Sequence, residues 1–406
     1  MRLILSGGGT GGHVYPALSI AQALERELPP GARLEVLYVG SPGGAEAGIV
    51  DRAGFPFRGI RSAPIRGRLP WEMAANGAQM AMGTAQARGV LRDFRPQVVL
   101  STGGYASFPV ALAARSRGVP LAVYLPDLYP GWAVRAIARL AQRVAVTAVE
   151  SLRRLPAGKS AVTGYPVRDE FWRATRAGGR ERLGLDPEEK VLFVTGASQG
   201  AHSINKAIAS ELPGLLQLCE VVHLCGDADE PWLSDIRHGF PDELRSRYHL
   251  FGYLHDDTPW AMAAADLAIC RSGASGLGEL PAVGLPAILV PYPYAGGHQS
   301  LNARYLERHG AAVILEDSQL GGLLPIVGQL LHDENRLRDM RAASRRLARP
   351  DAARRIAHIL LDLASENGHA PENSYTNDSH ANDSHASDSH ASDSHAGDSH
   401  AGDSHE

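Results

Sequence analysis

Short apolar runs alternate with helical stretches along most of the chain. The runs have the length of buried strands, and the segments between them carry a helical period. Buried strands that alternate with helices form parallel sheets with helices on both faces. After a first strand at the N-terminus, the predicted strands are Leu34–Val39, Val98–Ser101, Leu121–Tyr124, Val144–Ala148, Val191–Thr195, Val221–Leu224, Leu267–Cys270, Ala287–Pro291 and Ala312–Leu315.

The strands fall into two series, which predicts an α/β protein with two doubly wound domains and a ligand cleft between them. Glycine and proline interrupt the pattern at Thr163–Asp169, so we expect domains at 1–163 and 164–344. Arg336–Leu363 is expected to be helical, and the last helix, 345–366, is expected to join the first domain.

Residues 369–406 have a different composition. From Asn377 the chain repeats a five-residue unit containing Asp-Ser-His, with few hydrophobic residues. Such a segment cannot bury a core, so it is predicted to be a disordered tail. Its repeated histidines could bind zinc, nickel or copper weakly, although a solvated spacer or an added extension is the simpler interpretation.

The N-terminus predicts a strand, a tight loop and a helix. The apolar run Leu3–Leu5 leads into Gly7–Gly12, where only Thr10 interrupts the glycines, and His13 follows. Such a loop lets backbone N–H groups approach an anion or a sugar at the positive end of a helix dipole. An imidazole at its mouth can accept a proton near neutral pH. The first helical turn therefore predicts a ligand site.

The same loop also satisfies the dinucleotide-binding pattern G-x-G-x-x-G, which is typical of nicotinamide and flavin oxidoreductases. That pattern requires an acidic residue at the end of the second strand to hold a ribose. Here the second predicted strand ends in Gly40, Ser41 and Pro42, and Glu46 is expected later, in a loop. The sequence therefore disfavours a dinucleotide site.

Composition and charge narrow the function classes. No apolar run is long enough for a transmembrane helix, the N-terminus does not resemble a signal peptide, and the cysteines lack metal-ligand spacing. A reduced cytoplasmic compartment is expected. The net charge is +10 over residues 1–165, −6 over 166–368 and −8 over 369–406. The basic part predicts an anionic partner, and no nucleic-acid motif accompanies it.

Two loops in the second half suit a nucleotide sugar. Gly196–Ala201 follows a strand and carries Ser198, which suits a diphosphate, although an ordinary capped turn has a similar composition. In Arg271–Leu280, backbone amides begin a helix and Glu279 lies one turn further on, where a carboxylate can accept ribose hydroxyls. A glutamate on a helix surface is the ordinary alternative. Three polar side chains suited to sugar hydroxyls follow within one helical turn: His298, Gln299 and Asn302.

In their order and spacing, these segments resemble the nucleotide-sugar glycosyltransferases with two Rossmann domains, in particular the MurG-type N-acetylglucosaminyltransferases of peptidoglycan synthesis. The matching segments are GGTGGH (Gly8–His13), STGGYASFP (Ser101–Pro109), GYPVR (Gly164–Arg168), GASQGAHSIN (Gly196–Asn205), RSGASGLGE (Arg271–Glu279) and HQSLNA (His298–Ala303). The resemblance implies a GT-B architecture, two Rossmann-like domains facing a cleft. It also implies transfer of N-acetylglucosamine from UDP-N-acetylglucosamine to lipid I, which makes lipid II.

The resemblance assigns the donor mainly to the second domain. It implies that Glu279 binds the uridine ribose and that amides near Leu254 meet the uracil. The implied diphosphate residues are Ser198, Gly273 and Ala274, with Arg168 close to them. The implied sugar residues are His298, Gln299, Asn302 and, from the first domain, Asp127.

The resemblance assigns the undecaprenyl-pyrophosphate-linked acceptor to the first domain. The implied residues for its pyrophosphate are Thr10, Gly11, Gly12, Gly103, Gly104 and Tyr105. The positive charge of this half agrees, since acceptor and membrane surface are both anionic. Pro70–Met82, with Trp71 and three methionines, could rest on lipid, although a core helix is an equal alternative. We expect a peripheral protein on the cytoplasmic face of the membrane.

One segment departs from the family, which has His-Glu-Gln-Asn after its fifth strand where this chain has Tyr124-Leu125-Pro126-Asp127. The position of His298 is also often Gln. These departures leave the acceptor open, so a paralogue acting on another lipid acceptor is an alternative. A UDP-N-acetylglucosamine 2-epimerase shares the architecture, but the glycine-rich acceptor loop disfavours it.

The expected reaction is an inverting transfer in which His13 is the catalytic base. The alternative is that His13 only hydrogen-bonds to backbone or phosphate. Helix N-termini would stabilise the leaving diphosphate. The chain has no Asp-x-Asp pair in a suitable loop, so no required cofactor or metal is expected, and a divalent cation at most stimulates. A nonenzymatic metal-binding protein defined by the tail is the alternative from another class.

Overall fold

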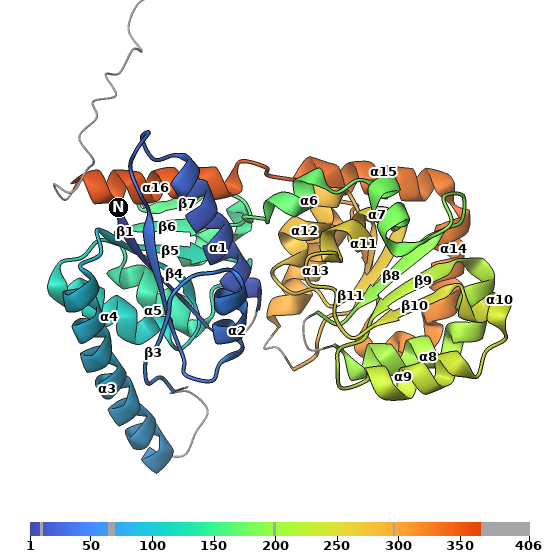
Figure 1. The fold of residues 1–406 in the computed structure, drawn as a ribbon, viewed down its shortest axis with the longest axis horizontal. Coiled ribbons are helices and arrows are strands. Elements are labelled where there is room, and N and C mark those ends of the chain that lie inside the picture. Colours follow the sequence, from blue (N-terminus) through green and yellow to red (C-terminus); the bar gives the residue numbers. More distant parts are fainter. Residues whose placement is uncertain (9–10, 64–69, 198–199, 295–296, 367–406) are drawn as a thin grey trace, which may run out of the picture. The chain divides into compact units, whose positions relative to one another are not determined.

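Two sheets of parallel strands organise the computed structural model, which describes residues 1–8, 11–63, 70–197, 200–294 and 297–366 (Figure 1). The first sheet has the order β3-β2-β1-β4-β5-β6-β7 and the second β10-β9-β8-β11-β12-β13. The strands of the first are β1 (Arg2–Gly7), β2 (Glu35–Gly40), β3 (Phe57–Gly59), β4 (Val98–Gly103), β5 (Leu121–Leu125), β6 (Arg143–Val146) and β7 (Ser160–Val162). Those of the second are β8 (Val191–Thr195), β9 (Glu220–Leu224), β10 (Tyr248–Phe251), β11 (Leu267–Cys270), β12 (Ala287–Leu289) and β13 (Ala312–Ile314).

Side chains alternate between the two faces of each sheet, which fills a core on both sides. In β1, Leu3 and Leu5 enter one core cluster and Ile4 enters another. The first face is covered by α1 (Gly11–Arg26), α2 (Ala45–Arg52) and α16 (Ala352–Glu366). The other is covered by α3 (Pro70–Phe94), α4 (Ser107–Arg117) and α5 (Trp132–Leu140).

The second sheet is covered in the same way. Val191 and Phe193 of β8 share a core cluster with Leu3 and Leu5, while Leu192 enters a separate one. Both sheets lie within one compact unit. On the face of Phe193 lie α7 (Arg176–Leu183), α11 (Thr258–Ala264), α12 (Gly276–Val283) and α13 (His298–Arg308). On the other lie α8 (His202–Leu218) and α14 (Leu323–His332).

The remaining elements are connections and peripheral helices. They are η1 (Val149–Arg154), α6 (Asp169–Arg173), α9 (Glu230–His238), α10 (Asp242–Arg245), η2 (Asp317–Gly322) and α15 (Glu334–Leu347).

Every predicted strand is present, with its ends moved by at most a few residues. The prediction missed β3, β7 and β10, which are only three or four residues long. Continuous helix over Arg336–Leu363 was wrong. The helix breaks between α15 and α16 because Pro350 lacks an N–H group and disfavours helix at the residue before it. Beyond the break, α16 packs against α1.

The placement of Glu46 in a loop was also wrong, since it lies in the first turn of α2. Its side chain is buried, and Oε1 accepts a hydrogen bond from the backbone N–H of Ser41 at 2.9 Å. The carboxylate therefore braces the turn after β2.

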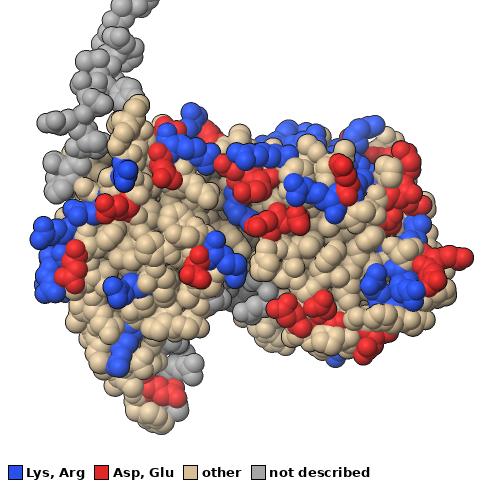
Figure 2. Space-filling view, viewed as in Figure 1, with Lys and Arg blue, Asp and Glu red and all other residues tan. Residues whose placement is uncertain are grey.

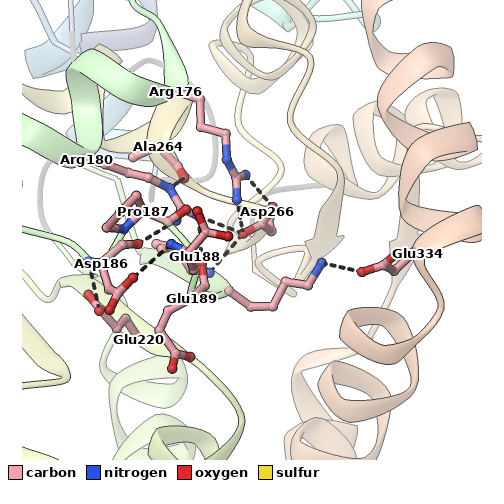
Figure 3. Close-up of polar contacts among 12 residues, drawn as sticks. Arg176, Arg180, Asp186, Pro187, Glu188, Glu189, Glu220, Ala264, Asp266 and Glu334 are labelled. Atoms are coloured by element: carbon pink, nitrogen blue, oxygen red, sulfur yellow. Dashed lines mark hydrogen bonds and ion pairs between the residues drawn. The ribbon is translucent and has the colours of Figure 1, made fainter.

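Asp266, directly before β11, stabilises the amino end of the second sheet. Its buried carboxylate pairs with Arg176, Arg180 and Arg341, two of which are seen in Figure 3. It also accepts a hydrogen bond from the backbone N–H of Val191, at the start of β8, at 3.0 Å. Removing one partner from such a buried network typically costs about 3–5 kcal/mol. This cluster joins α7 and α15 to the amino ends of β8 and β11.

In the part of the chain that the structure describes, no helix combines the length and the apolar character needed to cross a bilayer. The predicted disorder and metal affinity of the tail concern residues outside the described ranges.

Candidate active site

The strand order creates a switch point in each sheet, between β1 and β4 and between β8 and β11. Loops at the carboxyl ends of such neighbouring strands lead in opposite directions and leave a crevice where ligands bind. The two loops assigned to the acceptor follow β1 and β4, and the two assigned to the diphosphate follow β8 and β11. Each pair of predicted loops therefore meets at a switch point.

The loops after β1 and β4 cross at van der Waals distance, which requires glycine. Gly104 has φ +86°, and a Cβ atom there would lie 2.6 Å from the carbonyl oxygen of Gly8. Gly103 has φ +101°, and its Cβ would lie 2.8 Å from Cγ2 of Val134. The backbone N–H of Gly8 donates to the carbonyl of Gly103 at 3.2 Å.

His13, in the first turn of α1, is held by the end of β4. Its Nδ1 lies 2.6 Å from the carbonyl oxygen of Thr102. A carbonyl oxygen can only accept, so Nδ1 carries the proton and donates it. The neutral imidazole then has its lone pair on Nε2. His13 is thus held in the tautomer that a general base requires.

The other described residues predicted for the acceptor lie at the start of α1 and at the end of β4. Gly11 and Gly12 begin α1, where backbone N–H groups lack helical partners. Tyr105 follows Gly103, the last residue of β4, and Gly104, and it is 45% exposed. Thr10 lies outside the described residues.

Glu279 and Arg168 form the charged part of the donor half. Glu279 lies in the first turn of α12, and burial raises its pKa, while Arg168 and a hydrogen bond with Ser275 oppose the rise. The Arg168 guanidinium lies over the rings of Tyr15 and Phe171, with 4.6 and 5.4 Å to the ring centroids. Its buried Nε has no hydrogen-bond partner among the described residues, which leaves one donor for a ligand.

The predicted diphosphate residues Gly273 and Ala274 precede α12, in a loop anchored by Arg271. The Arg271 guanidinium donates to Asp317 at 2.6 Å and to Ser203 Oγ at 2.7 Å. Because Asp317 and Ser203 hold the Arg271 side chain in place, the backbone amides of Gly273 and Ala274 are held at the N-terminus of α12. Ser198, in the partner loop, lies outside the described residues.

Three of the four predicted sugar residues occupy the first turns of α13, and two of these contact the loop after β5, which carries the fourth, Asp127. His298 Nδ1 donates to the carbonyl of Tyr129 at 3.2 Å, and the side-chain amide of Asn302 hydrogen-bonds to Asp127. Gln299 Oε1 accepts from the backbone N–H of Tyr292 at 2.9 Å, which leaves its NH₂ group for a ligand. The structure therefore brings Asp127 together with His298 and Asn302.

The sequence analysis missed a group of tyrosines that lie close to the start of α1. The hydroxyls of Tyr15 on α1 and Tyr253 after β10 lie 3.4 Å apart, and that of Tyr165 donates to the carbonyl of Gly12 at 3.4 Å. Burial raises the pKa of Tyr165 and Tyr253, so both stay protonated at neutral pH. Tyr15 stands two residues after His13, which was a usable signal, whereas no pattern marks Tyr253. The predicted uracil residue Leu254 follows it and is partly buried.

Two other features bear on what this region can bind. The described residues contain no group of three or more His, Cys, Asp or Glu side chains placed to hold a metal ion. A cavity of about 370 Å³ lies between the ends of β6, α13 and α15, and none of the predicted site residues lines it.

Comparisons with protein families place matches in both halves of the chain. Residues 3–146 match the glycosyltransferase family 28 N-terminal domain, and residues 191–356 match the glycosyltransferase family 28 C-terminal domain. Together they cover nearly all of the two sheets described above, with β7 lying between the two matched ranges.

Curated relatives match over nearly their whole length. The chain is 43% identical to the UDP-N-acetylglucosamine–N-acetylmuramyl-(pentapeptide) pyrophosphoryl-undecaprenol N-acetylglucosamine transferase of Roseiflexus sp. (strain RS-1), over 89% of this chain and 94% of the relative. It is 40% identical to the enzyme of the same name from Desulforudis audaxviator, over 90% of this chain and 99% of the relative.

Solved structures show the same architecture. MurG from Acinetobacter baumannii superposes with a TM-score of 0.68 at 25% identity, over 89% of this chain and 99% of that one. A UDP-GlcNAc 2-epimerase from Neisseria meningitidis, solved bound to UDP-GlcNAc, has a TM-score of 0.66 at 15% identity, over 89% of this chain and all of that one. The latter likeness shows the fold alone.

A Glu279→Gln variant tests whether this carboxylate is kept for a ligand. The raised pKa means that the folded protein binds the Glu279 proton more tightly than the unfolded chain does. The stability that Glu279 contributes is therefore lost as the pH rises from about 4.5 through the raised pKa. We expect Glu279→Gln to be at least as stable as the wild type at pH 7–8, measured by thermal unfolding. UDP affinity, measured by calorimetry, should fall about tenfold or more, because charge-assisted hydrogen bonds are the stronger kind.

The control is Glu181→Gln, an exposed position on α7, which should change neither property. Unchanged UDP affinity in Glu279→Gln removes the ribose assignment, and a clear loss of stability makes the carboxylate structural.

Proposed function

Because this chain belongs to glycosyltransferase family 28, we propose that it transfers N-acetylglucosamine from UDP-N-acetylglucosamine to an undecaprenyl-pyrophosphate-linked muramyl acceptor. The product is lipid II, the precursor of peptidoglycan, when the acceptor is lipid I. The curated relatives carry this activity in their names. The geometry of His13 supports this function most directly, since a proton acceptor stands at the switch point of the N-terminal domain.

We assign the donor to the C-terminal domain. Glu279 binds the ribose hydroxyls, and the amides of Gly273 and Ala274 bind the diphosphate at the N-terminus of α12. The free donor on Arg168 Nε reaches the same diphosphate. The NH₂ group of Gln299 binds a hydroxyl of the sugar. Two observations support these assignments: burial disfavours the charge of Glu279, and Arg168 Nε has no hydrogen-bond partner among the described residues.

The acceptor occupies the loops after β1 and β4. The N–H groups that begin α1 bind its pyrophosphate, as helix N-termini bind anions. The acceptor hydroxyl gives its proton to Nε2 of His13 and attacks the anomeric carbon. The bond from that carbon to the β-phosphate oxygen breaks, the configuration inverts and UDP leaves with the electron pair. Helix dipoles stabilise the new charge on UDP, so the reaction needs no metal ion.

The function is tested with radiolabelled UDP-N-acetylglucosamine offered with lipid I and, separately, with other polyprenyl-linked acceptors. We expect transfer to lipid I, with and without a chelator. Transfer only to another acceptor would identify a paralogue, and transfer to none overturns the proposal. Conversion of the nucleotide sugar without any acceptor would instead indicate an epimerase.

His13→Asn separates catalysis from hydrogen bonding. The asparagine NH₂ group can still donate to Thr102, as Nδ1 does now, but asparagine cannot accept a proton near neutral pH. We expect kcat to fall about 10²–10⁴-fold, the usual contribution of a general base, with little change in KM for UDP-N-acetylglucosamine. A loss of less than tenfold would show that His13 only holds the loops in place.

We further propose that α3 rests on the cytoplasmic face of the membrane. Trp71 and Met82 are 68% and 46% exposed, and eleven residues are close to three helical turns, so they share one side of the helix. Arg61 lies against Met82, with 3.5 Å from Nη1 to the sulfur, and can meet anionic headgroups. In Figure 1, α3 extends away from the sheet, and Figure 2 shows the same region as mostly uncharged surface, with an acidic patch near its lower end and basic patches above it.

Replacing Trp71 and Met82 by Ser tests this surface. Binding to vesicles that contain phosphatidylglycerol should weaken severalfold in a flotation assay, because exposed apolar area is lost. Activity on a short-chain, water-soluble acceptor should be unchanged. Met73→Ser is the control, since Met73 is 43% exposed but lies on the opposite side of the helix from Met82. Equal vesicle binding by the double variant and the wild type would exclude this surface.

A further inference from the structure

The loop after β5, in the N-terminal domain, is joined to the start of α13, in the C-terminal domain. Asn302 Nδ2 donates to Asp127 Oδ1 at 3.0 Å, and the backbone N–H of Leu128 donates to Asn302 Oδ1 at 3.3 Å. His298 Nδ1 donates to the carbonyl of Tyr129 at 3.2 Å. We call these five residues the clasp.

Asn302 is the centre of the clasp and has no free hydrogen-bonding group. Its side chain is buried, and its second NH₂ hydrogen is donated to the carbonyl of Ser272 at 3.1 Å. Ser272 belongs to the loop that precedes α12, and its hydroxyl donates to the carbonyl of Gln299 at 2.9 Å. Asn302 therefore links the N-terminal domain to the diphosphate loop and the sugar-binding turn at once.

Aromatic contacts support the edge of the clasp. The rings of Tyr129 and His298 meet edge to face, with 5.4 Å between centroids. The Arg154 guanidinium lies over the Tyr129 ring, 4.2 Å from its centroid. The backbone carbonyl of Tyr129 is thus held in place for His298.

Asp127 has the chemistry of a fixed acceptor. A carboxylate only accepts hydrogen bonds, so it can hold the Asn302 amide in only one orientation. Among the described residues, the side chain that hydrogen-bonds to Asp127 is Asn302. A side-chain amide at position 127 could also accept through its oxygen, but without the charge that strengthens the bond.

We propose that Asp127 is a positioning residue: by accepting from Asn302 it holds the two domains closed and fixes the diphosphate loop through Ser272. This role rests on the proposed transferase function, since it concerns the site that binds the nucleotide sugar. It replaces direct contact between Asp127 and the sugar with an effect transmitted through Asn302.

The clasp predicts an effect that is visible without any ligand. The Leu128 amide is one of its donors, so its hydrogen exchange reports how often the clasp opens. In ligand-free Asp127→Ala we expect this exchange to accelerate about tenfold or more, the weight of one hydrogen bond to a charged group. Asp127→Asn, which keeps an acceptor oxygen, should stay within about threefold of the wild type. A residue that only contacts sugar would leave the exchange unchanged, which overturns the proposal.

Steady-state kinetics and a swap of the two side chains at positions 127 and 302 complete the test. Asp127→Ala should raise KM for UDP-N-acetylglucosamine more than it lowers kcat. Asn302→Asp places two carboxylates together and should open the clasp further, and adding Asp127→Asn should restore at least part of the closed state. No rescue by the second substitution contradicts a direct pairing.

The control is Asp169→Ala. Asp169 on α6 forms an ion pair with Arg26 on α1 at 2.7 Å, which is another contact between the two domains. Both of these side chains are more exposed than the buried Asn302 of the clasp. The Asp169→Ala substitution should not change Leu128 exchange. Exchange is measured without substrate, so an accelerated Leu128 amide supports the clasp even if lipid I proves not to be the acceptor.

Discussion

Parallel strands end at one edge of a sheet, and the chemistry of this protein depends on that constraint. The strand pairings are parallel. The glycine-rich and polar loops that follow the strands therefore lie together at the carboxyl ends, and the loops that lead from the helices into the strands lie at the amino ends. The strand order then reverses beside β1 and beside β8, which opens space for a ligand twice. One set of glycines can serve an acceptor and another helix start can serve a nucleotide because the same architecture occurs twice.

The two ends of the second sheet are built from different interactions. At the amino end, Asp266 is surrounded by arginines and gives the sheet a fixed base. At the carboxyl end, Arg168 Nε has no hydrogen-bond partner among the residues that the structure describes, and burial disfavours the charge of the Glu279 carboxylate. The stabilising ion pairs therefore lie at the amino end of the sheet, where no ligand is expected. The polar groups that a ligand could stabilise lie at the carboxyl end, where the ligand is expected.

The sequence was sufficient for the longer strands of both sheets and for the loops at their switch points, because hydrophobic period and glycine clusters are local signals; it missed the short strands β3, β7 and β10. It failed where tertiary contacts decide the outcome. Glu46 lies in the first turn of α2, where its carboxylate accepts a hydrogen bond from the backbone N–H of Ser41. Tyr253 meets Tyr15 across 238 positions, and Asn302 meets Asp127 across 175, so no local pattern could pair them. Asp127 was noticed as a departure from the family, but its partner emerged only from the fold.

The carbonyl of Thr102 behind His13 has a consequence for the end of the reaction. In a serine protease triad a carboxylate stands behind the imidazole and stabilises its charged form. Here the group behind Nδ1 is a neutral backbone oxygen that can take no proton. In the proposed reaction, the proton that Nε2 of His13 takes from the acceptor hydroxyl has no inward route, so it leaves by the same nitrogen. Under the proposed mechanism, solvent reaches Nε2 before the next turnover, which ties the recovery of the proposed base to the departure of the proposed product.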